Sequence, residues 1–155
     1  VELDSAESNA RLGYDAFLQP LIDDGKLPAE NVHPFLYERG VNAYTDEFKK
    51  YGAAFDIVLL SAGEDGHIAS LFPGHASVKS DEQYFIEVND SPKPPRQRMS
   101  ASRALLERSD SALLLFFGDK KKQAVACFKD ESIDVEDCPA KSVQAAENVY
   151  VYTTE

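Results

Sequence analysis

The chain has 155 residues, of which 43% are hydrophobic and 28% charged, so its length suits one globular domain. Its formal net charge of −11 argues against a nucleic-acid partner, because a phosphate backbone is bound by a basic face. No apolar stretch is long enough to cross a bilayer, and the first residues lack the regions of a signal peptide, so we expect a cytoplasmic protein without membrane contact.

Helical and strand patterns alternate along residues 1–155, and no repeat, low-complexity tract or linker divides them. Apolar spacing predicts a helix from Tyr14 to Leu21, although Pro20 is expected to end or kink it by Gln19. The later elements are predicted at Asn31–Tyr37 (extended), Val41–Tyr51 (helix), Phe55–Leu60 and Tyr84–Val88 (strands), Ser102–Arg108 (helix), Ala112–Phe117 (strand), Lys120–Phe128 (helix) and Asn148–Thr153 (strand). Strands separated by helices predict a single layered α/β domain.

The most informative segment is the apolar run Phe55–Leu60 and the turn that follows it. The run is almost continuously apolar, which predicts a strand of a parallel sheet that is covered on both faces. The residues after it are Gly63, Glu64, Asp65, Gly66 and His67. Ligands of open parallel sheets bind at the carboxyl ends of the strands, so this turn is the predicted site.

The apolar residues after the turn, from Ile68 to Phe72, predict a short buried helix that Pro73 and Gly74 end. His67 would then lie near a helix amino end, which suits an anion or a developing oxyanion.

His67 is the candidate general base, because an imidazole with a pKa near ~6.5 accepts a proton from water at neutral pH. Asp65 has two interpretations: it orients the imidazole, or it accepts backbone N–H groups and stabilises the turn. The backbone amides near Gly63 and Gly66 are candidate oxyanion donors. His75 is predicted to end the short helix rather than to take part in catalysis.

Two segments are basic within an acidic chain. Residues 89–103 carry a local charge of +3, and residues 119–130 carry +2. Both could attract a small anion, although solvated lysines on a helix are the plainer interpretation of the second. The prolines of Asn89–Arg98 either join two elements or hold Lys93, Arg96 and Arg98 beside a site.

Several other chemistries lack their motifs. The three histidines form no HExxH or HxH group, and no GxSxG or GxGxxG sequence occurs, so no metal or organic cofactor is expected. Cys127 and Cys138 lie without CxxC spacing, and reduced thiols are the better prediction.

The strings SAGEDGHIASLFPGH and SPKPPRQRMSAS, together with SESN and NVH nearer the start, resemble the 6-phosphogluconolactonase family. The resemblance implies hydrolysis of 6-phosphoglucono-δ-lactone, without a cofactor, on a three-layer α/β/α Rossmann-like fold with a mostly parallel sheet. It also implies that Arg98 and Lys121 bind the substrate's phosphate. The partner is thus a small phosphorylated sugar lactone; the oligomeric state stays open, with a monomer as one option.

Members of the family begin with further strands before the SN motif, including a glycine-rich phosphate loop. This chain starts almost at that motif, so we expect those N-terminal strands to be missing and a partial domain to be present.

Two alternatives stay open beside the lactonase. Glucosamine-6-phosphate deaminases are similar in the DGH turn but typically read DGHIAFNEP, and the position of that glutamate is Phe72 here, which cannot transfer a proton. The other alternative is a non-catalytic fragment that binds a sugar phosphate.

Overall fold

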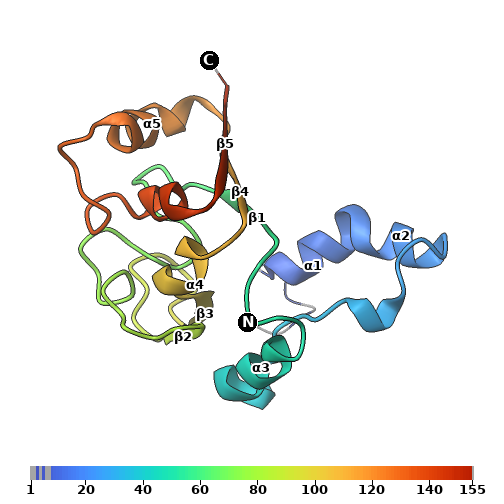
Figure 1. The fold of residues 1–155 in the computed structure, drawn as a ribbon. Helices are drawn as coiled ribbons and strands as arrows, with labels where there is room; N and C mark the ends of the chain where they lie inside the picture. Colours follow the sequence, from blue (N-terminus) through green and yellow to red (C-terminus); the bar gives the residue numbers. More distant parts are fainter. Residues whose placement is uncertain (1–2, 4, 6–7, 155) are drawn as a thin grey trace.

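The structure, a computed structural model, describes residues 3, 5 and 8–154 and has a parallel three-stranded main sheet (Figure 1). Its strands are β1 (Ile57–Ser61), β4 (Ser111–Phe116) and β5 (Asn148–Thr153), in the order β1-β4-β5. Ile57 pairs with Ser111, and Ser111 pairs with Asn148 on its other side. The prediction of an α/β chain with parallel strands is therefore confirmed, and the three strands begin within two residues of their predicted starts.

A second, antiparallel sheet joins β2 (Phe85–Val88) to β3 (Arg98–Ala101). The proline-containing residues 89–97 connect the two strands and are called the proline loop below. The sequence predicted β2 but not β3, because Arg98 was assigned to the loop. Pairing across the loop fixes the position of Arg98 opposite Val88.

The N-terminal helical arm consists of α1 (Asn9–Gly13), a π-helical turn (Tyr14–Leu18) and α2 (Gln19–Asp23). Of the two outcomes predicted at Pro20, an end of the helix by Gln19 is wrong, since α2 continues to Asp23; the irregularity is a π-helical turn directly before Gln19. The Gln19 amide donates to the Tyr14 carbonyl, five residues earlier, and Pro20 then occupies the first turn of α2, where its missing N–H costs nothing. The arm contains no buried residue among those described.

Three further helices lie close to their predicted positions: α3 (Gly40–Lys49), α4 (Arg103–Glu107) and α5 (Lys122–Lys129). Ser102 caps α4, since its hydroxyl accepts the Leu105 amide at 3.1 Å. Short 3₁₀ segments occupy Ala29–Asn31, Tyr37–Arg39, Asp119–Lys121 and Pro139–Ala145. None of the helices in the described part of the chain is long and apolar enough to cross a membrane.

The main sheet is covered on one face only. Ala112, Leu114 and Phe116 of β4 are buried in the core, whereas Ile57 and Leu59 of β1 are each 66% exposed. The prediction that β1 is covered on both faces is therefore wrong for the described residues. In Figure 1, α4 and α5 lie on one side of the sheet, and the arm of α1 and α2 extends away on the other.

The difference between the two faces of the sheet can be tested with one leucine substitution on each face. Leu114→Ala should lower the free energy of unfolding by about 2–5 kcal/mol, because it leaves a cavity in the core. Leu59→Ala removes the same atoms from an exposed position and should change it by less than about 0.5 kcal/mol. Urea unfolding of both variants measures the difference, and equal losses would contradict this assignment of the two faces.

Candidate active site

The turn after β1 is closed by its own backbone. The Gly63 amide donates to the His67 carbonyl at 2.7 Å, and the Gly66 amide donates to the Gly63 carbonyl at 3.1 Å. Gly66 has φ +83°, a conformation that favours glycine. The amides of Gly63 and Gly66 are thus both engaged inside the turn, and the prediction that amides near these glycines donate to an oxyanion stays a prediction.

The residues after the turn do not form the predicted short helix. Ala69 has φ +49°, and Ile68 and Leu71 form an isolated antiparallel bridge. The Ser70 amide donates to the Ser100 hydroxyl at 3.0 Å instead of to a carbonyl of its own segment. The positive φ of Ala69 is incompatible with a right-handed helix, so His67 does not lie at a helix amino end.

Asp65 and His67 form a hydrogen-bonded pair. His67 Nδ1 lies 2.5 Å from Asp65 Oδ1. Burial alone would raise the pKa of Asp65, but hydrogen bonds from Lys93 and His67 outweigh it and lower this pKa to about 2. An ionised carboxylate only accepts hydrogen bonds, so Nδ1 carries the proton and Nε2 is left as the proton acceptor.

The surroundings of His67 keep its imidazole neutral. Its side chain is only 17% exposed, and its ring centroid lies 4.8 Å from that of Phe72. Burial lowers the pKa of His67 below its ordinary value, and the charges of Lys93 and Arg98 lower it further, while Asp65 opposes the shift. A neutral imidazole at pH 7 is the form that can act as a base.

Arg98 ties the proline loop to the turn region. Its Nε donates to the Pro95 carbonyl at 3.1 Å, and its Nη2 donates to the carbonyls of Pro94, at 2.8 Å, and Lys93, at 3.3 Å. Its guanidinium carbon lies 5.5 Å from the centroid of the Phe72 ring. Nη1 makes no hydrogen bond to a described residue and is the atom left for a ligand. The phosphate-binding role of Arg98 stays a prediction.

Lys121 also reaches the turn. Its ammonium group donates to the carbonyl of Ala62 at 2.6 Å, directly before Gly63. Lys120 lies on the outer side, with its ammonium 3.9 Å from Glu64. The structure thus brings Lys121 to the turn, as expected of a site residue, and its phosphate-binding role stays a prediction.

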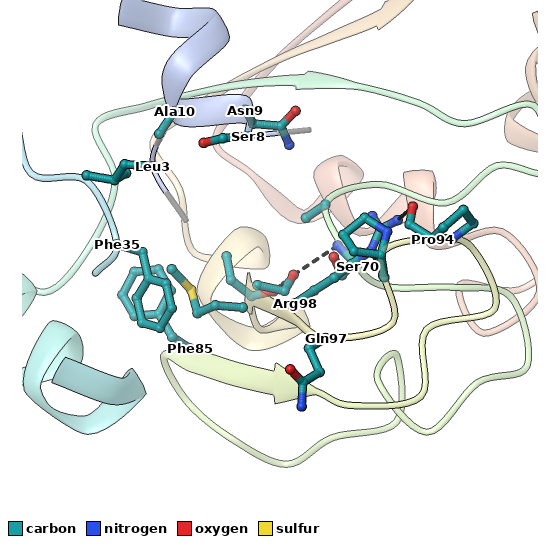
Figure 2. A pocket seen from close by; sticks show the side chains of 15 residues that line it. Leu3, Ser8, Asn9, Ala10, Phe35, Ser70, Phe85, Pro94, Gln97 and Arg98 are labelled. Carbon is teal, nitrogen blue, oxygen red and sulfur yellow. Dashed lines mark hydrogen bonds between the residues drawn. The ribbon is translucent and has the colours of Figure 1, made fainter. Parts of the chain in front are cut away.

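A hollow of about 550 Å³ opens beside the proline loop (Figure 2). Figure 2 shows Arg98, Ser70 and Pro94 on one side, and Ser8 and Asn9 at the start of α1 on another. Phe35 and Phe85 line its far end. The aromatic wall was not anticipated, whereas Ser8 and Asn9 could have been found from the SESN motif.

The thiols of Cys127 and Cys138 are free and lie behind Gly66. A β-carbon on Gly66 would come 3.2 Å from Cys138 Sγ, so this face of the turn is tightly packed. Nowhere in residues 8–154 do three His, Cys, Asp or Glu side chains gather in a way that could hold a metal ion.

Gly63 offers a direct test of the geometry of the pair. A β-carbon at Gly63 would lie 2.0 Å from His67 Nδ1, so Gly63→Ala should displace the imidazole and break its bond to Asp65. The low-field NMR signal of the Nδ1 proton should disappear. Gly13→Ala, whose β-carbon meets nothing closer than 3.7 Å, is the control and should keep the signal. If the signal persists in Gly63→Ala, the turn differs from the one described.

Comparison with known proteins identifies a matching family and several similar proteins. The family model described as glucosamine-6-phosphate isomerases/6-phosphogluconolactonase matches residues 1–152. The chain is 35% identical to 6-phosphogluconolactonase of Borreliella burgdorferi, over 99% of this chain and 67% of that protein. It is 29% identical to the chloroplastic 6-phosphogluconolactonase 3 of Arabidopsis thaliana, over 92% of this chain and 47% of that protein.

Among solved structures, the 6-phosphogluconolactonase of Thermotoga maritima superposes with a TM-score of 0.80 at 26% identity, over all of this chain and 68% of the other. The chain therefore spans about half to two thirds of the length of these relatives. It belongs to the 6-phosphogluconolactonase family, within the wider group that also contains the glucosamine-6-phosphate isomerases.

Proposed function

We propose that this protein hydrolyses 6-phospho-D-glucono-1,5-lactone to 6-phosphogluconate, with His67 as the general base. The observation that carries the proposal is the His67–Asp65 pair, in which Nδ1 is bound to an ionised carboxylate and Nε2 is unprotonated. The family relationship supports the substrate, since the similar proteins are 6-phosphogluconolactonases.

The chemistry follows from the ester group of a lactone. Nε2 of His67 takes a proton from water while the water oxygen attacks the ring carbonyl, which gives a tetrahedral oxyanion. The oxyanion then expels the ring oxygen, the C–O bond breaks, and the imidazolium returns its proton to that oxygen. Asp65 accepts the hydrogen bond from Nδ1–H throughout and stabilises the positive charge that His67 carries between the two steps.

The phosphate is proposed to bind at Arg98 and Lys121. The free Nη1 of Arg98 and the ammonium of Lys121 provide positive charge near the turn in a chain whose net charge is −11. A guanidinium also offers planar, directional donors to phosphate oxygens. The sugar ring is proposed to occupy the hollow beside Arg98, which Ala69 and Ser70 line and His67 and Lys121 do not.

The deaminase alternative is disfavoured by Phe72. This residue occupies the position where the deaminase motif has a carboxylate, and its side chain is 1% exposed and packed against His67. A buried phenyl ring can neither donate nor accept the proton that opening of the sugar ring requires.

We also infer that the open face of the main sheet is covered in the intact enzyme, which would complete the three-layer α/β/α arrangement. Exposed apolar side chains on β1 and the part of the relatives' length that this chain does not span support this inference. A longer protein in which this face is covered should then turn over the lactone faster than the 155-residue chain. Release of 6-phosphogluconate from fresh lactone, above spontaneous hydrolysis, distinguishes an active enzyme from a non-catalytic binding fragment.

His67→Asn should lower kcat by about 10²- to 10⁴-fold, because it removes the base while keeping a polar side chain of similar size. Lactonase turnover in the intact protein measures the loss. His75→Asn is the matched control, since the His75 side chain is 18% exposed and bonds to Asp90 and Ser77 rather than to the turn. Its turnover should stay far above that of His67→Asn. Full activity of His67→Asn would show that His67 is not the general base.

Arg98→Ala should raise KM for the phosphorylated lactone more than it lowers kcat, because the lost guanidinium binds a group remote from the reacting carbonyl. Part of any kcat loss will come from the proline loop, which Arg98 holds through three hydrogen bonds. An unphosphorylated lactone separates the two effects. If its kcat/KM falls as much as that of the phosphorylated substrate, Arg98 does not bind phosphate.

A further inference from the structure

The ammonium group of Lys93 reaches the catalytic pair from the proline loop. Lys93 Nζ lies 2.9 Å from Asp65 Oδ2, the carboxylate oxygen that His67 does not use. It also lies 3.4 Å from His67 Nδ1. Because Nδ1 already donates its proton to Asp65, the second contact is electrostatic and sets a positive charge beside the imidazole.

The backbone around Lys93 is held on both sides. The Ser91 hydroxyl donates to the Lys93 carbonyl at 2.7 Å and accepts the Lys93 amide at 3.3 Å, and Ser91 is 3% exposed. Arg98 binds the carbonyls of Lys93, Pro94 and Pro95 from the other side. These five hydrogen bonds fix the direction from which Lys93 enters the site.

This arrangement points away from a phosphate-binding role for Lys93. Its charge is paired with the Asp65 carboxylate at hydrogen-bond distance, and its side chain is 40% exposed. A phosphate would have to compete with Asp65 for the same ammonium, and winning that competition would leave a partly buried carboxylate without its cation. The other cations of the site, Arg98 and Lys121, bond only to carbonyl oxygens among the described residues.

We propose that Lys93 is a positioning residue of the active site, whose ammonium holds the Asp65 carboxylate against His67 Nδ1 and disfavours the imidazolium in the resting enzyme. The proposal rests on the proposed hydrolysis for its catalytic meaning. The Asp65 carboxylate is then fixed at both oxygens, which sets the plane of the imidazole and the direction of Nε2.

The charged groups around His67 determine the direction in which its pKa changes when Lys93 is removed. Lys93 faces it from the proline loop and Arg98 from the start of β3, and both lower its pKa, whereas Asp65 faces it from the turn and raises its pKa. Two further ionisable pairs lie nearby: Lys120 with Glu64 on the outer side of the turn, and His75 with Asp90 beyond Phe72.

Lys93→Met should therefore raise the pKa of His67, because one of the charges that disfavours the imidazolium is gone. A base works in its deprotonated form, so the acid limb of kcat/KM should move to higher pH. We expect kcat to fall by about tenfold from the loosened geometry. KM should change by less than roughly twofold, as expected of a residue that does not bind substrate.

The experiment follows the imidazole signals of His67 by NMR across the pH range in the intact protein, together with the pH profile of lactone hydrolysis. Lys93→Arg should keep both midpoints near those of the wild type. Lys120→Met is the matched control, since it removes the same charge from a lysine that pairs with Glu64 on the same turn, and it should leave both midpoints unchanged. Urea unfolding checks that each variant is folded.

The pKa of His67 measured by NMR tests the proposal independently of turnover. An unchanged His67 midpoint in Lys93→Met, or an equal shift in Lys120→Met, overturns it. A large rise in KM with an unchanged pH profile also overturns it and makes Lys93 a phosphate ligand. If the wild type lacks lactonase activity while the midpoint still moves as expected, the proposed function fails and the electrostatic role of Lys93 stands.

Discussion

The site depends on one ionised carboxylate. Asp65 accepts a hydrogen bond from His67 Nδ1 with one oxygen and one from the Lys93 ammonium with the other. The first bond assigns the tautomer of the imidazole and leaves Nε2 unprotonated. The second counteracts the cost of placing a carboxylate in a partly buried turn. Without the carboxylate, the Lys93 ammonium would lie beside a neutral imidazole with no counter-charge, and the proline loop would have no electrostatic reason to approach the turn.

The turn itself explains why the site sits at the end of β1. Gly63 leaves space for the imidazole, since a β-carbon there would overlap Nδ1, and Gly66 provides the positive φ that brings the chain back. The backbone amides of both glycines close the turn internally. In this conformation neither of these two amides is free to stabilise a developing oxyanion, and Lys93 and Lys121 bring positive charge to the turn.

The sequence predicted what depends on neighbouring residues. The apolar strands and the helix at α3 are local, so their periodicity was enough. The spacing of Asp65 and His67 left two interpretations open, and Asp65 accepts both the imidazole Nδ1–H and the His67 backbone amide. The features that were missed depend on contacts between distant segments. Ala69 adopts a φ of +49° inside the run that was predicted as a helix, and the Ser70 amide donates to the hydroxyl of Ser100, thirty residues away. Likewise, the approach of Lys93 to Asp65 depends on how the proline loop folds over the turn.

Phe72 lies between His67, the proposed base, and Arg98, the proposed phosphate-binding residue. Its buried ring lies between the His67 imidazole, at 4.8 Å, and the Arg98 guanidinium, at 5.5 Å. One ring thus removes water from around the imidazole, which lowers the pKa of His67, and offers its face to the cation that orients the proline loop. A carboxylate in this position would pair with Arg98 and stabilise the imidazolium. An apolar ring instead keeps His67 neutral. Ester hydrolysis by an activated water needs this neutral imidazole as a base, whereas opening of a sugar ring needs a proton donor.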